Sequence, residues 1–322
     1  MSAPLHKPVM LDEMLAAIAP RDGGAYVDGT FGAGGYSRAI LESADCSVCA
    51  IDRDNDAVAL GQEMEKTYRG RFTIVCGRFG DMLPLLRDRG IDRVDGVVLD
   101  LGVSSMQLDQ AERGFSFRAD GPLDMRMSQS GPSAAEIVNG LEESALAEII
   151  RDLGEERFAR RVARAIVEAR RLAPITRTEQ LAHVVRRAVP RAKDGIDPAT
   201  RTFMALRLHV NEELDELDRG LQAAEQLLGP GGRLVVISFH SLEDRRVKRF
   251  MHARSRRTHG VSRHVPQPDK TLLPSFKLLH RRALSPSDAE IRANSRARSA
   301  HLRAAERTGS PAWPPQPERI AA

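Results

Sequence analysis

The sequence GAYVDGTFGAGGYSR, residues 24–38, joins a short apolar run to a glycine-rich turn. The run over 24–29 is bounded by glycine and predicts a β-strand, and the pattern over 36–43 predicts a helix after the turn. Glycines let the backbone of such a turn approach a ligand closely, beside the N-terminus of the next helix. The stretch therefore predicts the first strand–turn–helix unit of an open α/β sheet, with a ligand site at its mouth.

The same alternation continues through the first hundred residues. Further strands are predicted over 47–52, 71–76 and 93–100, with helices over 55–68 and 82–90 between them. Strands that alternate with helices form a parallel sheet with right-handed crossovers, so we expect an α/β fold.

Between residues 107 and 207 the strand signal almost disappears, and helices are predicted over 144–154, 155–172 and 177–190. The alternation then resumes with a helix over 208–228, a turn over 228–232, a strand over 233–239, a helix from Leu242, and strands over 275–284 and 298–307. We therefore expect a discontinuous sheet domain over 1–107 and 208–308, an inserted helical domain over 108–207, and a disordered, proline-rich tail over 309–322.

The charges are distributed unevenly along a chain of ordinary globular composition. Hydrophobic residues make up 42% and the net charge is only +4. Between Arg245 and Arg307, however, there are 17 Lys or Arg against 4 Asp or Glu, which leaves 31 against 40 in the rest. This basic region suggests a polyanionic partner, and a solvated arginine-rich surface is the alternative.

The three cysteines give no sign of a disulfide framework or a metal site. An odd, low cysteine count in a long chain is typical of a reducing cytosol. Cys46 and Cys49 have CxxC spacing but lie on a predicted strand, and no second pair completes a zinc site, so we expect core residues. The sequence shows no signal peptide and no apolar run of membrane-spanning length, so we expect a cytoplasmic protein without a metal or a membrane contact.

The glycine-rich turn has features that point to a cationic nucleoside. Asp28 ends the first strand, where a carboxylate suits a cation and repels a pyrophosphate. A dinucleotide fingerprint starting at Gly32 fails because its third glycine position is Ser37, which disfavours a dehydrogenase. Asp52 ends the second strand, twenty positions after Gly32, and is placed to accept both ribose hydroxyls. The alternative is a tight turn with a strand-end acid.

Three later residues are further candidates. Phe79 follows the third strand, where it is placed either to pack on a nucleobase or to belong to the core. Asp100 ends the fourth strand at the switch point of the sheet. Gln107 follows shortly after and is within reach of a cofactor or a substrate.

With these residues the chain resembles the bacterial 16S rRNA cytosine-N4 methyltransferase family, known as MraW or RsmH. The most specific matching segments are GVSSMQLDQAERGFSF (102–117) and ISFHSLEDR (237–245), and the resemblance runs from residue 6 to 307. It implies a class I (Rossmann-like) S-adenosylmethionine methyltransferase fold whose inserted helical domain recognises the substrate. It also implies N4-methylation of a decoding-centre cytosine, at the ribosomal P site, in 16S rRNA of the small subunit, and is compatible with a homodimer.

Asp28 and Gly32 are candidates for cofactor binding from the turn itself. By matching position, the resemblance assigns further cofactor contacts to Gly34, Gly35, Tyr36, Asp52, Phe79, Asp100 and Gln107. Many members of the family have His where this chain has Tyr36. A backbone contact at that position would tolerate the change, whereas a side-chain contact would alter affinity.

The chemistry expected from the resemblance calls for a proton acceptor. The lone pair of the cytosine amine is delocalised, so an acceptor that holds an amine hydrogen would favour attack and then remove the proton. Asp100 is the first candidate, and His240 and Asp244 are the second, although a lone His is often structural. Methylation at C5 would require a Cys nucleophile, and none follows the fourth or fifth strand.

The target base must be unpaired or flipped. Because aromatic residues make up only 4% of the chain, arginine contacts to the RNA backbone should dominate over stacking. In the predicted helix over 155–172, one face forms a core stripe of Phe158, Val162, Ile166 and Ala169. A second face is either solvated or turned toward RNA, and consists of Arg157, Arg160, Arg161 and Arg164.

Two other functions stay open. A catalytically inactive, nucleotide-binding ribosome-assembly factor would bind RNA without transferring a methyl group. A DNA amino-methyltransferase usually carries an acidic or polar residue followed by Pro-Pro-aromatic, whereas Asp100 is followed by Leu101, Gly102 and Val103.

Overall fold

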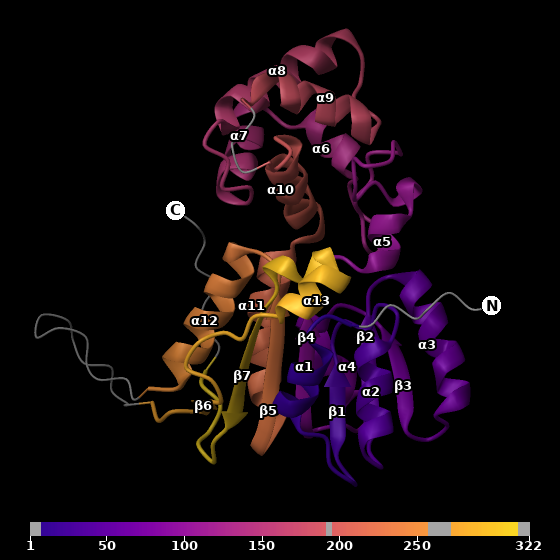
Figure 1. The fold of residues 1–322 in the computed structure, drawn as a ribbon, viewed down its shortest axis with the longest axis vertical. Helices are drawn as coiled ribbons and strands as arrows, with labels where there is room; N and C mark the ends of the chain where they lie inside the picture. Colours follow the sequence, from indigo (N-terminus) through magenta and orange to yellow (C-terminus); the bar gives the residue numbers. More distant parts are fainter. Residues whose placement is uncertain (1–7, 191–194, 257–271, 315–322) are drawn as a thin grey trace, which may run out of the picture. The chain divides into compact units, whose positions relative to one another are not determined.

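The computed structural model describes residues 8–190, 195–256 and 272–314, drawn in colour in Figure 1. The chain forms two compact units. One contains Met1–Gly102 with Asp215–Ala322, and the other contains Val103–Leu214. The predicted domain boundaries at 107/108 and 207/208 lie a few residues from these.

The first unit is built on a mixed sheet with the strand order β3-β2-β1-β4-β5-β7-β6. Its strands are β1 (Ala25–Asp28), β2 (Ser47–Asp52), β3 (Phe72–Cys76), β4 (Val94–Asp100), β5 (Leu228–Ser238), β6 (Phe276–Leu278) and β7 (His301–Arg307). The first five run parallel, and β7 is antiparallel to both β5 and β6. This is the α/β sheet that the strand–helix alternation predicted, and it agrees with the class I methyltransferase fold that the resemblance implied.

Helices of the first unit bury both faces of that sheet. They are α1 (Leu11–Ile18), α2 (Gly35–Ser43), α3 (Asn55–Thr67), α4 (Met82–Arg87), α11 (Glu213–Leu227) and α12 (Ser241–Arg254). The unit also contains the short helix α13 (Asp288–Ala293), in which no residue is buried. Val97 and Val98 are neighbours on β4, so their side chains point to opposite faces, and both are fully buried. Continuous runs of such β-branched residues are typical of parallel strands covered on both sides.

The second unit is helical around a core of its own. It contains α5 (Ser105–Asp109), α6 (Ala134–Gly140), α7 (Glu143–Asp152), α8 (Ala159–Leu172), α9 (Thr178–Ala188) and α10 (Ala199–Asn211). The predicted core stripe is confirmed, because Val162 and Ile166 are fully buried and Phe158 and Ala169 pack against the same cluster.

Three predicted elements were wrong in extent. The helix expected over 208–228 is two helices, because Glu212 takes a left-handed conformation with φ 54° between α10 and α11. Hydrophobic periodicity continues across such a break and does not reveal it. The strand expected over 275–284 is limited to β6, and the predicted turn over 228–232 lies within β5, where the register shifts.

The prediction of a disordered tail was wrong for residues 309–314. Trp313 is buried, its backbone N–H donates to Glu225 Oε1 (3.0 Å), and its indole N–H donates to the Leu273 carbonyl (2.8 Å). Burial of a large aromatic ring with both donors satisfied offsets the entropy of ordering the segment. Residues 315–322 of the predicted tail lie outside the described residues.

The cysteine prediction is confirmed for the CxxC pair. Cys46 and Cys49 are both free and buried, and burial raises the pKa of Cys49 to about 11. None of the helices within the described ranges is long and apolar enough to span a bilayer.

Candidate active site

Asp28 forms the buried end of β1. Its Oδ2 accepts a hydrogen bond from the Ser37 hydroxyl (2.7 Å), and its Oδ1 accepts one from the Thr30 N–H (3.2 Å). Burial raises the pKa of Asp28 to about 6 in spite of these two hydrogen bonds. A cation placed beside this carboxyl group would favour its ionised form.

The glycine turn requires glycine for its own geometry. Gly32 and Gly34 have left-handed φ values of 54° and 78°, and Gly34 is the N-cap of α2. A Cβ on Gly34 would lie 2.7 Å from the Phe31 ring, and one on Gly35 would lie 2.3 Å from Pro8 Cγ. The turn is thus held tightly by its own packing at the carboxyl end of β1.

Asp52 ends β2 and holds the turn in place. Its Oδ2 accepts the Gly32 N–H (2.8 Å), and its Oδ1 accepts the Asp54 N–H (2.9 Å). Burial raises the pKa of Asp52, and these hydrogen bonds oppose the shift. The Arg53 backbone N–H also contributes a hydrogen bond, and a carboxylate has about four acceptor positions, so Asp52 keeps some acceptor capacity for a ligand hydroxyl while it fixes the turn.

Asp100 ends β4 and carries a buried acceptor atom. Its backbone N–H donates to Thr30 Oγ1 (2.7 Å), but its buried Oδ1 has no hydrogen-bond partner among the described residues. Burial, followed by the charges of Asp28 and Glu243, raises the pKa of Asp100 well above its ordinary value. Buried acceptors are almost always satisfied, so this oxygen marks a position for a ligand donor or cation.

Tyr36 lies in the first turn of α2, and its hydroxyl is bonded within the protein. It is buried, and its hydroxyl donates to the Val9 carbonyl (2.5 Å). Burial raises the pKa of Tyr36 well above its ordinary value, with the charges of Asp100 and Asp28 acting in the same direction. A cofactor contact by Tyr36 would therefore fall to its backbone, and a backbone contact would tolerate the difference from the His of the family that the chain resembles.

Phe79 lies in a short 3₁₀ turn, Phe79–Asp81, after β3. A Cβ on Gly220 of α11 would lie 2.5 Å from the Phe79 ring, so the ring packs closely on that helix. The side chain is nevertheless only half-buried. Phe79 thus joins the sheet core and leaves part of its ring exposed for a nucleobase.

His240 caps α12 in a structural arrangement. Its Nδ1 accepts the Glu243 N–H (3.5 Å), and its Nε2 lies 3.0 Å from Glu243 Oε1 without the alignment of a hydrogen bond. Glu243 is itself buried, and its Oε2 accepts the Phe239 N–H (3.0 Å). Both ring nitrogens of His240 therefore face Glu243, which favours the structural alternative for this residue.

Asp244 is part of an ion pair. Its two oxygens lie 2.7 and 2.9 Å from the Arg303 guanidinium on β7. Burial alone would raise the pKa of Asp244, but Arg303 holds it below its ordinary value. A carboxylate engaged in this way is a weak proton acceptor, so Asp100 stays the leading candidate.

Gln107 belongs to the helical unit. It is buried, its backbone N–H donates to Ser104 Oγ (3.2 Å), and its Oε1 accepts the Ser104 N–H (3.0 Å), forming a capping box on α5. Its role at a cofactor stays a prediction.

Sequence reasoning missed three polar residues of this site. Thr30 fixes the backbone of Asp100, Ser37 donates to Asp28, and the buried Glu243 contacts His240 and raises the pKa of Asp100 by its charge. Thr30 and Glu243 lie inside segments that were singled out, DGTFGAGG and SFHSLEDR. Ser37 was considered only as a missing glycine.

The basic region over 245–307 is partly neutralised inside its own unit. Three of its arginines, Arg246, Arg254 and Arg303, pair with the acids Asp218, Glu225 and Asp244. Arg307 is buried. The local excess of positive charge therefore overstates the surface offered to a polyanion, and residues 257–271 lie outside the described residues.

Comparison with known proteins identifies the family of this chain. Residues 3–308 match the family described as the MraW methylase family. The chain is 62% identical to ribosomal RNA small subunit methyltransferase H of Paramagnetospirillum magneticum, over 97% of this chain and 99% of the relative. It is 59% identical to the enzyme of the same name from Rhodospirillum rubrum, over 97% of each chain. The chain therefore belongs to the MraW methylase family.

Proposed function

We propose that this protein transfers a methyl group from S-adenosylmethionine to the N4 nitrogen of a P-site cytosine in 16S rRNA. Membership of a methylase family and relatives named as small subunit rRNA methyltransferases support the reaction class and the substrate. The observation that carries the proposal is the buried Oδ1 of Asp100 at the carboxyl end of β4, which has no hydrogen-bond partner within the described part of the chain.

The residues present fit this cofactor. Asp52 keeps acceptor capacity for a ribose hydroxyl, and the partly buried Phe79 is placed to pack on adenine. Asp28 and Asp100 bring two buried carboxyl groups of raised pKa to the same edge of the sheet, where a positively charged ligand would stabilise them. When bound, S-adenosylmethionine supplies an electrophilic methyl group on a cationic sulfur, which needs no metal to activate it.

Asp100 is proposed to act on the acceptor amine. A carboxylate Oδ1 can accept an N–H of the cytosine amine, orient its lone pair and remove a proton. Burial makes Asp100 a stronger base once it is ionised, and a neighbouring cation favours the ionised form. The site thus uses one desolvated carboxylate for orientation and proton removal.

The cysteines disfavour methylation at C5. That reaction needs a thiolate nucleophile beside the base. Cys46 and Cys49 are buried at β2, and the exposed Cys76 ends β3. No Cys lies near the ends of β4 or β5 in the sequence, which favours the exocyclic nitrogen.

The helical unit Val103–Leu214 is proposed to recognise the RNA. The substrate is 16S rRNA within the small ribosomal subunit, which places the reaction in the cytoplasm. A homodimer is compatible with this proposal and is not required by it.

The decisive experiment is mass spectrometry of 16S rRNA from cells with and without this protein. Loss of N4-methylcytidine at one decoding-centre position in the deletion strain would support the proposal. Purified protein should also transfer a labelled methyl group to small subunits from that strain. RNA binding without transfer would instead identify an assembly factor, and transfer to DNA alone would identify a DNA amino-methyltransferase.

A further inference from the structure

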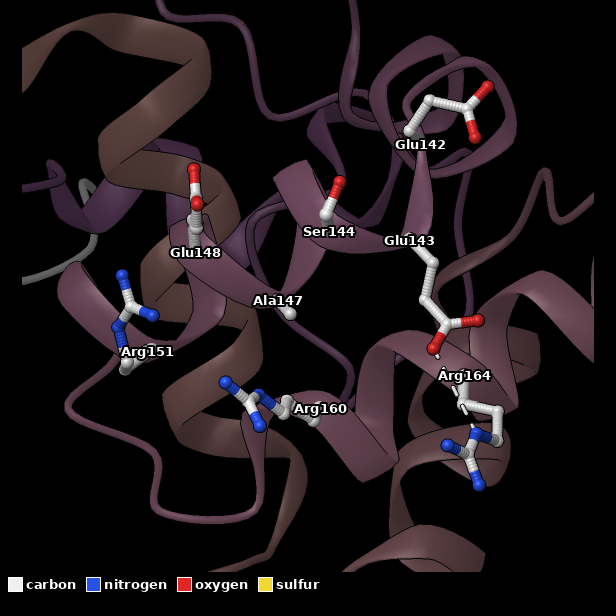
Figure 2. Close-up of a pocket in the computed structure, with 8 residues that line it drawn as sticks. All are labelled: Glu142, Glu143, Ser144, Ala147, Glu148, Arg151, Arg160 and Arg164. Carbon is white, nitrogen blue, oxygen red and sulfur yellow. Dashed lines mark ion pairs between the residues drawn. The ribbon is translucent and has the colours of Figure 1, made fainter.

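Two hollows between α7 and α8 form one groove on the surface of the helical unit. Their volumes are about 490 and 530 Å³. They share Ala147, Arg151 and Arg160, so each continues into the other. Figure 2 shows the first hollow, in which Arg160 extends from α8 toward Arg151 on α7.

The two ends of this groove differ in charge. The end in Figure 2 is lined by three acids, Glu142, Glu143 and Glu148, against three arginines. One of these arginines, Arg164, is paired with Glu143 at 3.8 Å. That end is close to neutral, so it has little attraction for an anion.

The other end, here called the basic end, is strongly positive. It is lined by four arginines, Arg151, Arg157, Arg160 and Arg161. Arg151 pairs with Asp152 at 2.7 Å, whereas Arg157, Arg160 and Arg161 are exposed and have no acidic partner among the described residues. The acid that lines this end, Glu156, is buried and accepts the Phe158 N–H (2.8 Å).

The basic end is also partly pre-organised. The Arg157 guanidinium lies over the Phe158 ring at 4.7 Å from its centroid, which limits its motion and leaves its N–H groups available. Planar guanidinium groups bind phosphate through paired hydrogen bonds, and several of them in one hollow suit a phosphodiester backbone.

We infer that the basic end of the α7–α8 groove binds the phosphate backbone of the substrate RNA through Arg157, Arg160 and Arg161. The inference rests on the proposed function for the identity of the RNA. The sequence predicted these three arginines and Arg164 as one face of a helix, and the inference assigns only the three to RNA binding. Arg164 lies at the neutral end with its acidic partner and does not belong to the RNA site.

The test uses the full chain and a fluorescein-labelled single-stranded fragment of 16S rRNA in a salt titration. Replacing Arg157, Arg160 and Arg161 with Ala should weaken binding about tenfold or more and lower the slope of log K against log salt by about 2. The matched control replaces Arg164, Arg171 and Arg187, which are exposed arginines of the same unit, and should change both quantities much less. Equal effects of the two triple variants would overturn the inference.

Two further measurements make the result decisive. A triple Lys variant at 157, 160 and 161 should recover most of the salt slope but only part of the affinity, because Lys lacks the planar fork. If the triple Ala variant loses binding to polyglutamate while RNA binding is unchanged, the groove is a site for an acidic protein and the inference fails.

The inference about the groove and the proposed function can be tested separately. Wild-type protein that binds the fragment but methylates no small subunits would contradict the proposed function, and a selective loss in the Ala variant would still support the groove. Normal methylation with an unchanged KM for small subunits in that variant would contradict the groove alone.

Discussion

The candidate active site of the sheet unit and the α7–α8 groove of the helical unit differ in how their charged groups are exposed to solvent. Asp28 and Asp100 are buried acids whose pKa values are raised by loss of solvent. Arg157, Arg160 and Arg161 are exposed cations in water. Desolvated charges interact strongly over short distances and are insensitive to salt, whereas exposed charges interact weakly and are screened. One region is therefore suited to chemistry, and the other to holding a long polyanion.

Substitution of Asp100 in the buried site is expected to have the largest effect. Replacing Asp100 with Ala should lower turnover by about 10²–10⁴ at saturating S-adenosylmethionine, the range for a positioned acid or base. Asp100→Asn keeps an acceptor without the charge and should fall between wild type and Ala. Single-turnover methylation of small subunits measures this directly.

The same experiment separates catalysis from cofactor binding. If Asp100 served only the cofactor, excess S-adenosylmethionine would restore the full single-turnover rate of the Ala variant. That result would remove Asp100 from catalysis and return attention to His240 and Asp244. Because Asp244 is held by Arg303, His240 would then be tested first.

Asp52 should show a smaller effect, confined to binding. Asp52→Ala should weaken S-adenosylmethionine binding by about 1.5–3 kcal/mol, because it removes charge-assisted hydrogen bonds and releases the Gly32 turn. Titration calorimetry measures the change, with the exposed Asp45→Ala as a matched acid-to-alanine control. Unchanged affinity in the Asp52 variant would contradict its assignment to the ribose.

The buried site should also bind its ligand in a pH-dependent manner. With a pKa of about 6, Asp28 holds a proton at lower pH, and a cationic ligand favours the ionised form. Binding should therefore release protons, and affinity should rise as the pH approaches about 6 and level off above it, by at most about tenfold per pH unit for each proton.

Calorimetry in buffers of different ionisation enthalpy would detect these protons. Asp28→Asn should remove the contribution of this group and flatten the profile, leaving that of Asp100. An identical profile in wild type and Asp28→Asn would show that Asp28 does not face the ligand's charge. RNA binding at the arginine groove should not share this dependence, because arginines do not titrate in this range.

The sequence predicted the strands of the sheet more accurately than it predicted helix breaks and long-range side-chain contacts. Strand β2 has the predicted bounds because a run of buried residues ends at a polar one, which periodicity detects. The break at Glu212 escaped prediction because a single left-handed residue leaves no periodic signal. Trp313 escaped because composition alone suggested disorder, whereas its burial depends on Glu225, far away in the sequence.

At the candidate active site, the acids at the strand ends could be predicted from the sequence, but the residues that pair with other charged side chains could not. Asp28, Asp52 and Asp100 could be found because parallel strands place their carboxyl ends at one edge. The pairing of Asp244 with Arg303 on β7 depends on how α12 packs, which the motif SFHSLEDR does not encode. The same limit applies to Arg164, whose acidic partner lies on another helix.

The smallest predicted effect compares two tyrosine hydroxyls in the sheet unit. The buried Tyr36 donates to the Val9 carbonyl (2.5 Å), whereas Tyr68 donates to the exposed Glu42 (2.9 Å). Tyr36→Phe should lower the free energy of unfolding by about 1 kcal/mol, because the buried carbonyl loses its donor and water cannot readily replace it. Tyr68→Phe should change it little, since water takes over the exposed hydrogen bond. Urea denaturation of both variants measures the difference, and equal losses would show that burial does not set the strength of these contacts.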